Sequence, residues 1–442
     1  MAQAAGQGLN GLSAAEAAAA IRRGALTSRA LVQACLDRIA ARDPVVRAWS
    51  HLDPALALAQ ADAADAVPLA ARGPLHGVPV GIKDILYTKD MPTRFNSPHF
   101  QDHFPNIDAA AVAILRQAGA VILGKNDTVE FAVNGRRAAT TNPHDPRRTP
   151  GGSSSGSAAA VADGQVPLSL GTQTGGSVIR PASYCGVWAI KPTWNAVSHE
   201  GFKVCAASFD TLGWYGRSAA DLDLLAEVFG IRDDTAPDVP ALDGLRLAFC
   251  ATPVWPQAEA ETRQAIDTAI DVLRRAGAIV ETLVLPPEFD GLTAAHKIIM
   301  QAEMRSAFLP DWRALGEALY PELVGILRNE SGHSHADLLA AQNLAARCRA
   351  VFDDLAAPYA AILTPSTAGI APFGPDNTGA AVFNRIWTLL HSPCVNVPGL
   401  TGPEGLPLGI TLTGPRFRDR QVLAVAARLG DALTTADNRE AM

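Results

Sequence analysis

The stretch TPGGSSSGSAAA, residues 149–160, decides the fold of this sequence. Its glycines and hydroxyl residues lead directly into an alanine-rich run that predicts a helix, because alanine is the best helix former. The short apolar segment 166–170 predicts a strand, and a second glycine-rich turn, GTQTGGS, follows at residues 171–177. Strand and helix signals alternate on both sides of these turns. Such alternation predicts an α/β sheet covered by helices.

The domain organisation follows from the absence of internal repeats and obvious linkers. We therefore expect one large domain over residues 1–442. Within it we expect N-terminal helices at 1–70 and a core that carries the chemistry at 71–235. A helical layer at 255–355 and a return to the core sheet at 356–435 complete the prediction.

Composition and charge exclude several classes of protein. Hydrophobic residues make up 48% of the chain and charged residues 18%, so it can bury a large core and is not intrinsically disordered. The net charge of −7 argues against a nucleic-acid partner, since such proteins usually carry a basic face. The six cysteines are scattered without a C-x-x-C pair, which is typical of a reducing compartment and predicts a cytoplasmic location.

The sequence predicts neither secretion nor membrane insertion. Residues 1–10 hold no positive cluster and no apolar segment of the kind found in secretory signals. The longest nearly apolar stretch, 109–124, is interrupted by Arg116 and Gln117, so it falls short of the ~18 apolar residues of a membrane span. We therefore expect no membrane partner.

Three simple interpretations of the Gly/Ser stretch are less favoured, and the second of them is rejected. A flexible linker does not usually lie between core strands or lead directly into a helix. A phosphate-binding loop requires Lys where Ser157 stands. A G-x-S-x-G nucleophile elbow requires a strand directly before the serine, and the sequence NPHDPRR at 142–148 cannot be a buried strand.

The two glycine-rich turns together suggest a site for nucleophilic chemistry. Gly175 and Gly176 can bring consecutive backbone N–H groups into one concavity, because neither carries a Cβ. Such a concavity stabilises an anion that develops on a carbonyl oxygen, and one donor is worth roughly 3 kcal/mol of barrier. Ser177 stands beside it as a nucleophile, and a serine nucleophile needs a base.

Lysine usage identifies a candidate base. Only six of the 37 basic residues are lysines, yet Lys83 lies inside the apolar run 77–86. Lysine, unlike arginine, can lose its proton when burial lowers its pKa. Lys83 is therefore either a general base or one partner of a buried ion pair with Asp84, and the sequence leaves both interpretations open.

Together these residues resemble the amidase signature family. The resemblance implies a single large α/β domain in which helices cover both faces of a mixed, twisted sheet. It runs from about residue 12 to 430, and its motifs lie at residues 77–84, 150–160, 171–177, 180–193 and 405–409.

The resemblance assigns roles to the residues already singled out. The family's Ser–cis-Ser–Lys triad falls on Ser177, Ser153 and Lys83. Ser177 would attack a carbonyl carbon, Ser153, on a cis peptide after Gly152, would relay the proton, and neutral Lys83 would be the final base. The expected oxyanion-hole N–H groups are those of Thr174, Gly175, Gly176 and Ser177.

Four further residues are expected to support this site, namely Ser154, Thr172, Gln173 and Arg180. Arg180 lies three residues after the nucleophile, which is similar to small bacterial amidases of the malonamidase type. In that group the equivalent arginine can bind a substrate carboxylate. The other interpretation is that Arg180 holds the turn by bonding nearby carbonyl groups.

The resemblance implies a hydrolase that works without a cofactor or metal. His333 and His335 have no third ligand at helical spacing, which argues against a metal site. Phe95 and Phe131 are the predicted lining of the substrate pocket. A homodimer is common among relatives, and the expected partner is a small-molecule amide or carbamate.

We therefore predict a serine hydrolase that cleaves the C–N bond of small amides, anilides or carbamates (urethanes) through an acyl-enzyme, with side esterase activity. The alternative is the A-type subunit of a tRNA-dependent amidotransferase. Gln173 stands where that subunit has Asp, which favours the first prediction.

Overall fold

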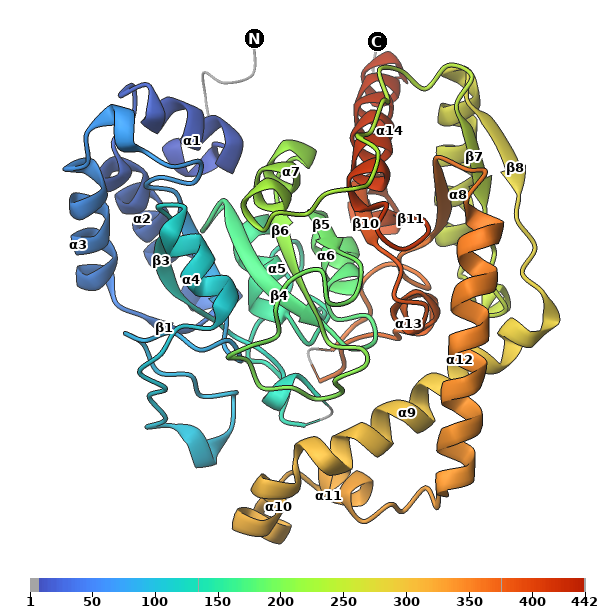
Figure 1. The fold of residues 1–442 in the computed structure, drawn as a ribbon. Coiled ribbons are helices and arrows are strands. Elements are labelled where there is room, and N and C mark those ends of the chain that lie inside the picture. Colours follow the sequence, from blue (N-terminus) through green and yellow to red (C-terminus); the bar gives the residue numbers. More distant parts are fainter. Residues whose placement is uncertain (1–7, 134, 375, 441–442) are drawn as a thin grey trace.

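An eleven-stranded mixed sheet forms the centre of the computed structural model, which describes residues 8–133, 135–374 and 376–440 (Figure 1). The strand order is β1-β3-β2-β4-β6-β5-β10-β11-β9-β7-β8. The strands are β1 (Trp49–Leu52), β2 (Pro79–Lys83), β3 (Val121–Asn126), β4 (Leu168–Gln173), β5 (Trp188–Lys191), β6 (Thr211–Gly216), β7 (Arg246–Phe249), β8 (Ile279–Thr282), β9 (Ala361–Pro365), β10 (Cys394–Thr401) and β11 (Pro407–Thr413).

Helices cover both faces of this sheet, so the predicted single α/β domain is confirmed (Figure 1). The described helices are α1 (Ala14–Arg22), α2 (Ser28–Val46), α3 (Pro54–Asp65), α4 (Ala110–Gln117), α5 (Ser155–Ala162), α6 (Ile179–Cys185), α7 (Ala219–Val228), α8 (Ala260–Arg275), α9 (Leu292–Ala307), α10 (Leu309–Leu315), α11 (Pro321–Leu327), α12 (His335–Ala356), α13 (Val382–Leu389) and α14 (Asp419–Glu440).

The middle of the sheet positions the motifs. β2 runs parallel to β3 and to β4, and all three strands are buried along their length. Because the carboxyl ends of parallel strands meet at one edge of a sheet, Lys83 at the end of β2 and Gln173 at the end of β4 lie at the same edge. The apolar run around Lys83 forms a strand because both of its faces are covered.

The helices that follow the two glycine-rich turns pack on different strands of the sheet and against each other. α5 begins within the Gly/Ser stretch and contacts β2 and β4, whereas α6 follows the second turn and contacts β10 and β11. Small residues allow this close packing: a Cβ on Gly156 would lie 2.2 Å from the carbonyl oxygen of Ala48. The sheet therefore holds both turns against each other through rigid helices.

The interval 255–355 contains α8 to α12 and also the edge strand β8. Figure 1 shows α9, α10 and α11 along the bottom of the view and α12 upright at its right, with α9 lying beneath α13. α9 also packs against α13 and α12. This arrangement brings α9 next to the second glycine-rich turn.

Among the described residues, no helix is both long and apolar enough to cross a membrane.

Candidate active site

Lys83 lies at the end of β2 with its ammonium group completely buried. Its Nζ donates to the Oγ of Ser153 at 2.8 Å and to the Oγ1 of Thr172 at 2.8 Å. Burial lowers the pKa of Lys83 to about 7, and the more distant carboxylate of Asp210 opposes this shift. The side chain is therefore poised between its charged and neutral forms at neutral pH.

The neighbouring carboxylate of Asp84 does not pair with Lys83. It lies 3.1 Å from the Nζ of Lys125, on β3, and both side chains are buried. The register of β2 against β3 causes this, because Lys125 is the partner of Ile82 in the ladder. Of the two interpretations left open by the sequence, the ion pair of Lys83 with Asp84 is absent from the structure.

Ser153 belongs to the Gly/Ser loop, defined here as residues 149–157. The peptide bond between Gly152 and Ser153 is cis. The carbonyl oxygen of Ser153 accepts hydrogen bonds from the Oγ1 of Thr128 at 2.9 Å and from the N–H of Val129 at 3.2 Å. These contacts fix the backbone so that the Ser153 hydroxyl points toward Lys83.

Ser154, next in the loop, has a different environment. It is fully buried, and its Oγ lies 3.2 Å from both the N–H and the carbonyl oxygen of Thr172 on β4. It does not line the cavity described below. Ser154 therefore ties the Gly/Ser loop to the strand, and Thr172 contacts both Ser154 and Lys83.

The second turn, called the glycine turn here (residues 174–177), connects β4 to α6. Gln173 braces it, because its Oε1 accepts from the N–H groups of Val178 at 2.9 Å and Ile179 at 3.1 Å. A Cβ on Gly176 would lie 2.4 Å from the Oδ1 of Asn384, so only glycine fits there. The bracing fixes the backbone directly after the turn without using the Ser177 hydroxyl.

Ser177 ends the glycine turn with its side chain in the same cavity that Ser153 lines. Its carbonyl oxygen accepts a hydrogen bond from the hydroxyl of Tyr215 at 3.2 Å, whereas its own hydroxyl has no partner among the described residues. The Ser177 hydroxyl is thus free to contact a bound molecule.

Two residues that the sequence analysis did not identify hold Thr174. Its hydroxyl donates to the buried carboxylate of Asp210, and its carbonyl oxygen lies 2.8 Å from the Nε2 of His296 on α9. A carbonyl can only accept, so this nitrogen carries the proton. Burial raises the pKa of Asp210 to about 6 and lowers the pKa of His296 to about 4. No local motif marks either residue, because each comes from a separate part of the chain.

Arg180, on α6, is buried and points back toward the Gly/Ser loop. Its two Nη groups donate to the carbonyl oxygens of Gly379 and Gly152, each at 2.5 Å. Its Nε has no partner among the described residues. This geometry matches the interpretation in which Arg180 holds backbone carbonyl groups.

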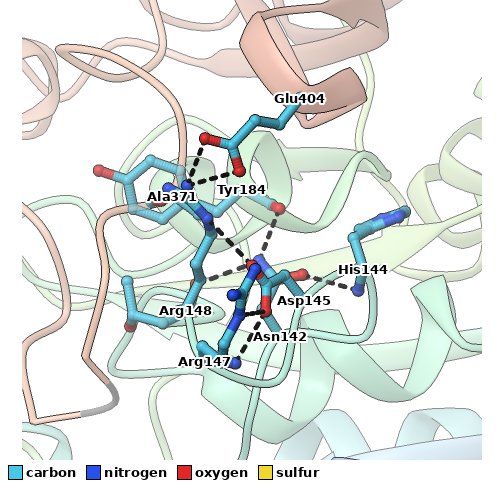
Figure 2. A network of polar contacts seen from close by, with 9 residues as sticks. Asn142, His144, Asp145, Arg147, Arg148, Tyr184, Ala371 and Glu404 are labelled. Atoms are coloured by element: carbon cyan, nitrogen blue, oxygen red, sulfur yellow. Dashed lines mark hydrogen bonds and ion pairs between the residues drawn. The ribbon is translucent and has the colours of Figure 1, made fainter.

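A polar network anchors the start of the Gly/Ser loop (Figure 2). Arg148 is buried, and its Nη1 donates to the carbonyl oxygen of Ala371 at 2.7 Å. Its Nη2 reaches both carboxylate oxygens of Glu404, at 3.1 and 3.0 Å, and its Nε lies 3.3 Å from Asp145. The guanidinium also covers the ring of Phe373 at 3.7 Å. These contacts join the loop to residues 371–373, which lead to a wall of the cavity.

The cavity in front of Ser153 and Ser177 has a volume of about 220 Å³. Its lining combines small, apolar and cationic residues and consists of Val129, Ala132, Val133, Arg137, Ser153, Thr174, Gly175, Gly176, Ser177, Arg180, Cys205, His296, Met300, Met304, Ile326, Thr378, Gly379, Ala380, Ala381, Val382 and Arg385.

Phe95 and Phe131, predicted to line the pocket, lie elsewhere. Their rings are 5.8 Å apart in a buried aromatic cluster that also contains Phe100 and Phe308, and neither lines the cavity. Apolar rings are usually buried in the core, and this cluster follows that rule. In the part of the chain that the structure describes, no group of three or more His, Cys, Asp or Glu side chains could hold a metal ion.

Comparison with known proteins places this geometry in a family. The family model described as Amidase matches residues 30–423. The A-type subunit of glutamyl-tRNA(Gln) amidotransferase from Chloroflexus aurantiacus is 34% identical over 96% of this chain and 96% of that protein. The solved structure of native peptide amidase from Stenotrophomonas maltophilia has a TM-score of 0.82 and 29% identity, covering 96% of this chain and 97% of that one. The corresponding amidotransferase structure from Thermotoga maritima has a TM-score of 0.80 and 27% identity, covering 95% and 94%.

The comparisons overturn one expectation, namely a small-molecule partner without nucleic acid. The relative from Chloroflexus aurantiacus is named as part of an amidotransferase for glutamyl-tRNA(Gln). The expectation rested on the net charge of −7, which averages over the whole surface and does not exclude a nucleic-acid partner. The same name fits our alternative function better than the small-amide hydrolase. Since the family model spans most of the chain and this relative is more than 30% identical over nearly all of it, the chain belongs to the amidase family whose signature motifs it carries.

Proposed function

We propose that this chain hydrolyses the C–N bond of a carboxamide through an acyl-enzyme on Ser177. The observation that carries the proposal is the 2.8 Å hydrogen bond between Lys83 and Ser153 at the edge of a cavity that Ser177 also lines. A buried lysine without a carboxylate partner can act as a base, because desolvation favours its neutral form.

The acylation step moves a proton along the row formed by Ser177, Ser153 and Lys83. Neutral Lys83 takes the proton of Ser153, Ser153 takes the proton of Ser177, and the Oγ of Ser177 forms a bond to the carbonyl carbon. The N–H groups of the glycine turn bind the resulting oxyanion. The proton then passes back to the nitrogen of the substrate, the C–N bond breaks, and ammonia or an amine leaves.

Deacylation repeats the proton transfer along the same row, with water in place of Ser177 as the nucleophile. Water loses a proton toward Ser153 and Lys83, its oxygen attacks the acyl carbon, and Ser177 leaves as a hydroxyl. An ester substrate would follow the same path, since an alkoxide leaving group needs less protonation than an amine. No cofactor enters either step.

The names of the relatives favour one version of this reaction. Several proteins named as the A-type subunit of glutamyl-tRNA(Gln) amidotransferase are 31–35% identical to this chain over at least 93% of its length. In that version the chain would fill the same place in a tRNA-dependent amidotransferase, and the ammonia released at Ser177 would be transferred to an acceptor on tRNA.

One feature of the cavity favours a second version, in which the chain alone hydrolyses small amides, anilides or carbamates. The described residues that line the cavity include three arginines and no aspartate or glutamate. The ammonium group of free glutamine would therefore face like charges without a partner. Gln173 stands where the A-type subunit has Asp, and its side chain braces the glycine turn. This position therefore supplies no carboxylate either.

Ammonia release by the purified chain tests the proposal and separates the two versions. Glutamine hydrolysis that requires partner subunits and aminoacyl-tRNA for full rate supports the amidotransferase. Turnover of simple amides, anilides, carbamates and esters by the chain alone supports the second version. In both versions Ser177→Ala abolishes turnover, and retention of activity in that variant contradicts the proposal.

A further inference from the structure

The glycine turn uses its carbonyl groups and its N–H groups differently. Its four carbonyl oxygens all accept hydrogen bonds, in chain order from the side chains of His296 and Thr388, the N–H group of Arg180 and the hydroxyl of Tyr215. The four N–H groups of residues 174–177 have no acceptor among the described residues. Buried backbone N–H groups are nearly always paired, so four in a row at the wall of a cavity are suited to an anion.

The geometry of the peptide bond links these two sets of groups. A planar trans peptide makes each carbonyl group and the N–H group that follows it point in opposite directions. The peptide bonds within the glycine turn are trans. A contact that fixes one carbonyl group of the turn therefore also sets the direction of the next N–H group.

We infer that His296 and Thr388 are positioning residues for the oxyanion hole. His296 holds the carbonyl group of Thr174 and thereby directs the N–H group of Gly175. Thr388 holds the carbonyl group of Gly175 and thereby directs the N–H group of Gly176. This inference rests on the proposed function, in which these N–H groups bind the oxyanion.

His296 reaches the turn from α9 with a rigidly held ring. The ring is 1% exposed and stacks on Phe209, with the centroids 4.6 Å apart and the planes 6° from parallel. Its Nε2 lies 2.8 Å from the carbonyl oxygen of Thr174, whereas its Nδ1 has no partner among the described residues. Burial lowers the pKa of His296 to about 4, so the neutral ring carries one proton, and that proton is on Nε2. The stacked ring aims this proton at the carbonyl group.

Thr388 reaches the turn from α13, which packs against α9 (Figure 1). Its Oγ1 lies 2.9 Å from the carbonyl oxygen of Gly175 and 3.2 Å from that of Asn384. The Nε2 of Gln173 donates to the same Oγ1 at 3.0 Å. Because this bond occupies a lone pair of the hydroxyl, the hydroxyl proton is left to point at a carbonyl oxygen, and that of Gly175 is the nearer. Gln173 therefore orients Thr388 as well as bracing the turn.

The other two carbonyl groups of the turn are held closer to α6. That of Gly176 accepts from the N–H group of Arg180 at 3.0 Å, within the first turn of α6. His296 and Thr388, in contrast, lie 122 and 213 positions away from the residues they hold. The directions of two N–H groups in the hole thus depend on helices from a distant part of the chain.

Removing each donor tests the inference on the purified full chain, with 4-nitrophenyl acetate as substrate. His296→Leu and Thr388→Val should each lower kcat about 10- to 100-fold, because a misdirected N–H group stabilises the oxyanion less. KM should stay within about twofold, since the hole acts in the transition state of both acylation and deacylation. Wild-type kcat in both variants would overturn the inference.

Conservative variants and a matched control separate positioning from loss of structure. His296→Gln and Thr388→Ser each keep a donor and should keep kcat within about fivefold of wild type. The control is His76→Leu, which removes a buried histidine whose Nε2 lies 2.8 Å from the carbonyl oxygen of Ala64. His76 precedes β2, whereas Lys83 ends that strand, so the control should lower the unfolding temperature and leave kcat unchanged. An equal loss of kcat in the control, or no recovery in the conservative variants, would contradict the inference.

The rate of fluorophosphonate labelling separates this inference from the proposed function. The phosphoryl oxygen gains negative charge when Ser177 attacks, so labelling should be at least about tenfold slower in His296→Leu and Thr388→Val. If the wild type neither hydrolyses amides or esters nor is labelled on Ser177, the proposed function fails. If Ser177 is labelled at the same rate in the wild type and in both variants, only the positioning roles fail.

Discussion

The Nζ of Lys83 and the Oγ of Ser153 lie 2.8 Å apart, although 70 positions separate the two residues in the sequence. β2 brings the lysine to the carboxyl edge of the sheet, and the Gly/Ser loop brings the serine over it. The pairing of Asp84 with Lys125 leaves Lys83 without a carboxylate partner. The site thus combines a hydroxyl with an amine that burial holds near its point of deprotonation.

Lys83→Ala should lower kcat/KM for an amide by at least about 100-fold, because it removes the proposed base. Burial lowers the pKa of Lys83 to about 7, and only the neutral form accepts a proton. Activity of the wild type should therefore rise with pH up to about 7 and then level off. The measurement is a pH profile of kcat/KM, and an identical profile in the variant would exclude Lys83 as the base.

Alanine substitutions of Ser177 and Ser154 should differ strongly in their effect on activity. Ser177→Ala should reduce kcat at least about 1,000-fold without loss of folding, since its hydroxyl has no partner to lose. Ser154→Ala should keep most of the activity, because Ser154 is buried against Thr172 and does not line the cavity. Steady-state kinetics with circular dichroism checks both, and the reverse result would make Ser154 the nucleophile.

Asp210→Asn should lower kcat about tenfold with little change in KM, because it weakens the support of Thr174 in the glycine turn. It should also move the acid limb of the pH profile to lower pH. The carboxylate of Asp210 raises the pKa of Lys83, so its removal lets that pKa fall further. Thr174→Ser, which keeps the hydroxyl, is the control. A loss of activity without movement of the acid limb would indicate a structural role only.

Arg148 and its partner Glu404 should differ in their effect on stability. Arg148→Met should cost about 1–3 kcal/mol of unfolding free energy, because the buried carbonyl of Ala371 loses its donor. Glu404→Gln should cost less than about 1 kcal/mol, since the Glu404 side chain is 57% exposed. Urea unfolding of both variants measures the difference, and equal losses would show that the ion pair dominates the network.

The fold was predictable because its signals are local. The alanine-rich run after Gly156 became α5, and the apolar segment before the second turn became β4. The partner of Lys83 was not predictable, because it depends on the strand register that places Lys125 beside Asp84. Sequence alone shows neither the register of β2 against β3 nor which lysine, Lys83 or Lys125, pairs with Asp84.

Residues that act through long-range contacts also escaped the sequence analysis. Asp210 precedes β6 and His296 lies on α9, and both reach the glycine turn only in the folded chain. The loop position of Phe131 near the motifs predicts that its ring lines the pocket. Its ring instead packs against Phe95 and Phe308, since burial of an aromatic surface is more favourable than its exposure in a polar cavity.

Labelling with a fluorophosphonate, followed by peptide mass spectrometry, tests the central claim most directly. The account predicts a single adduct on Ser177, formed faster as pH rises through about 7 and slowed strongly in Lys83→Ala. An adduct on another serine, or labelling of Ser177 at the same rate in the Lys83→Ala variant, would contradict it.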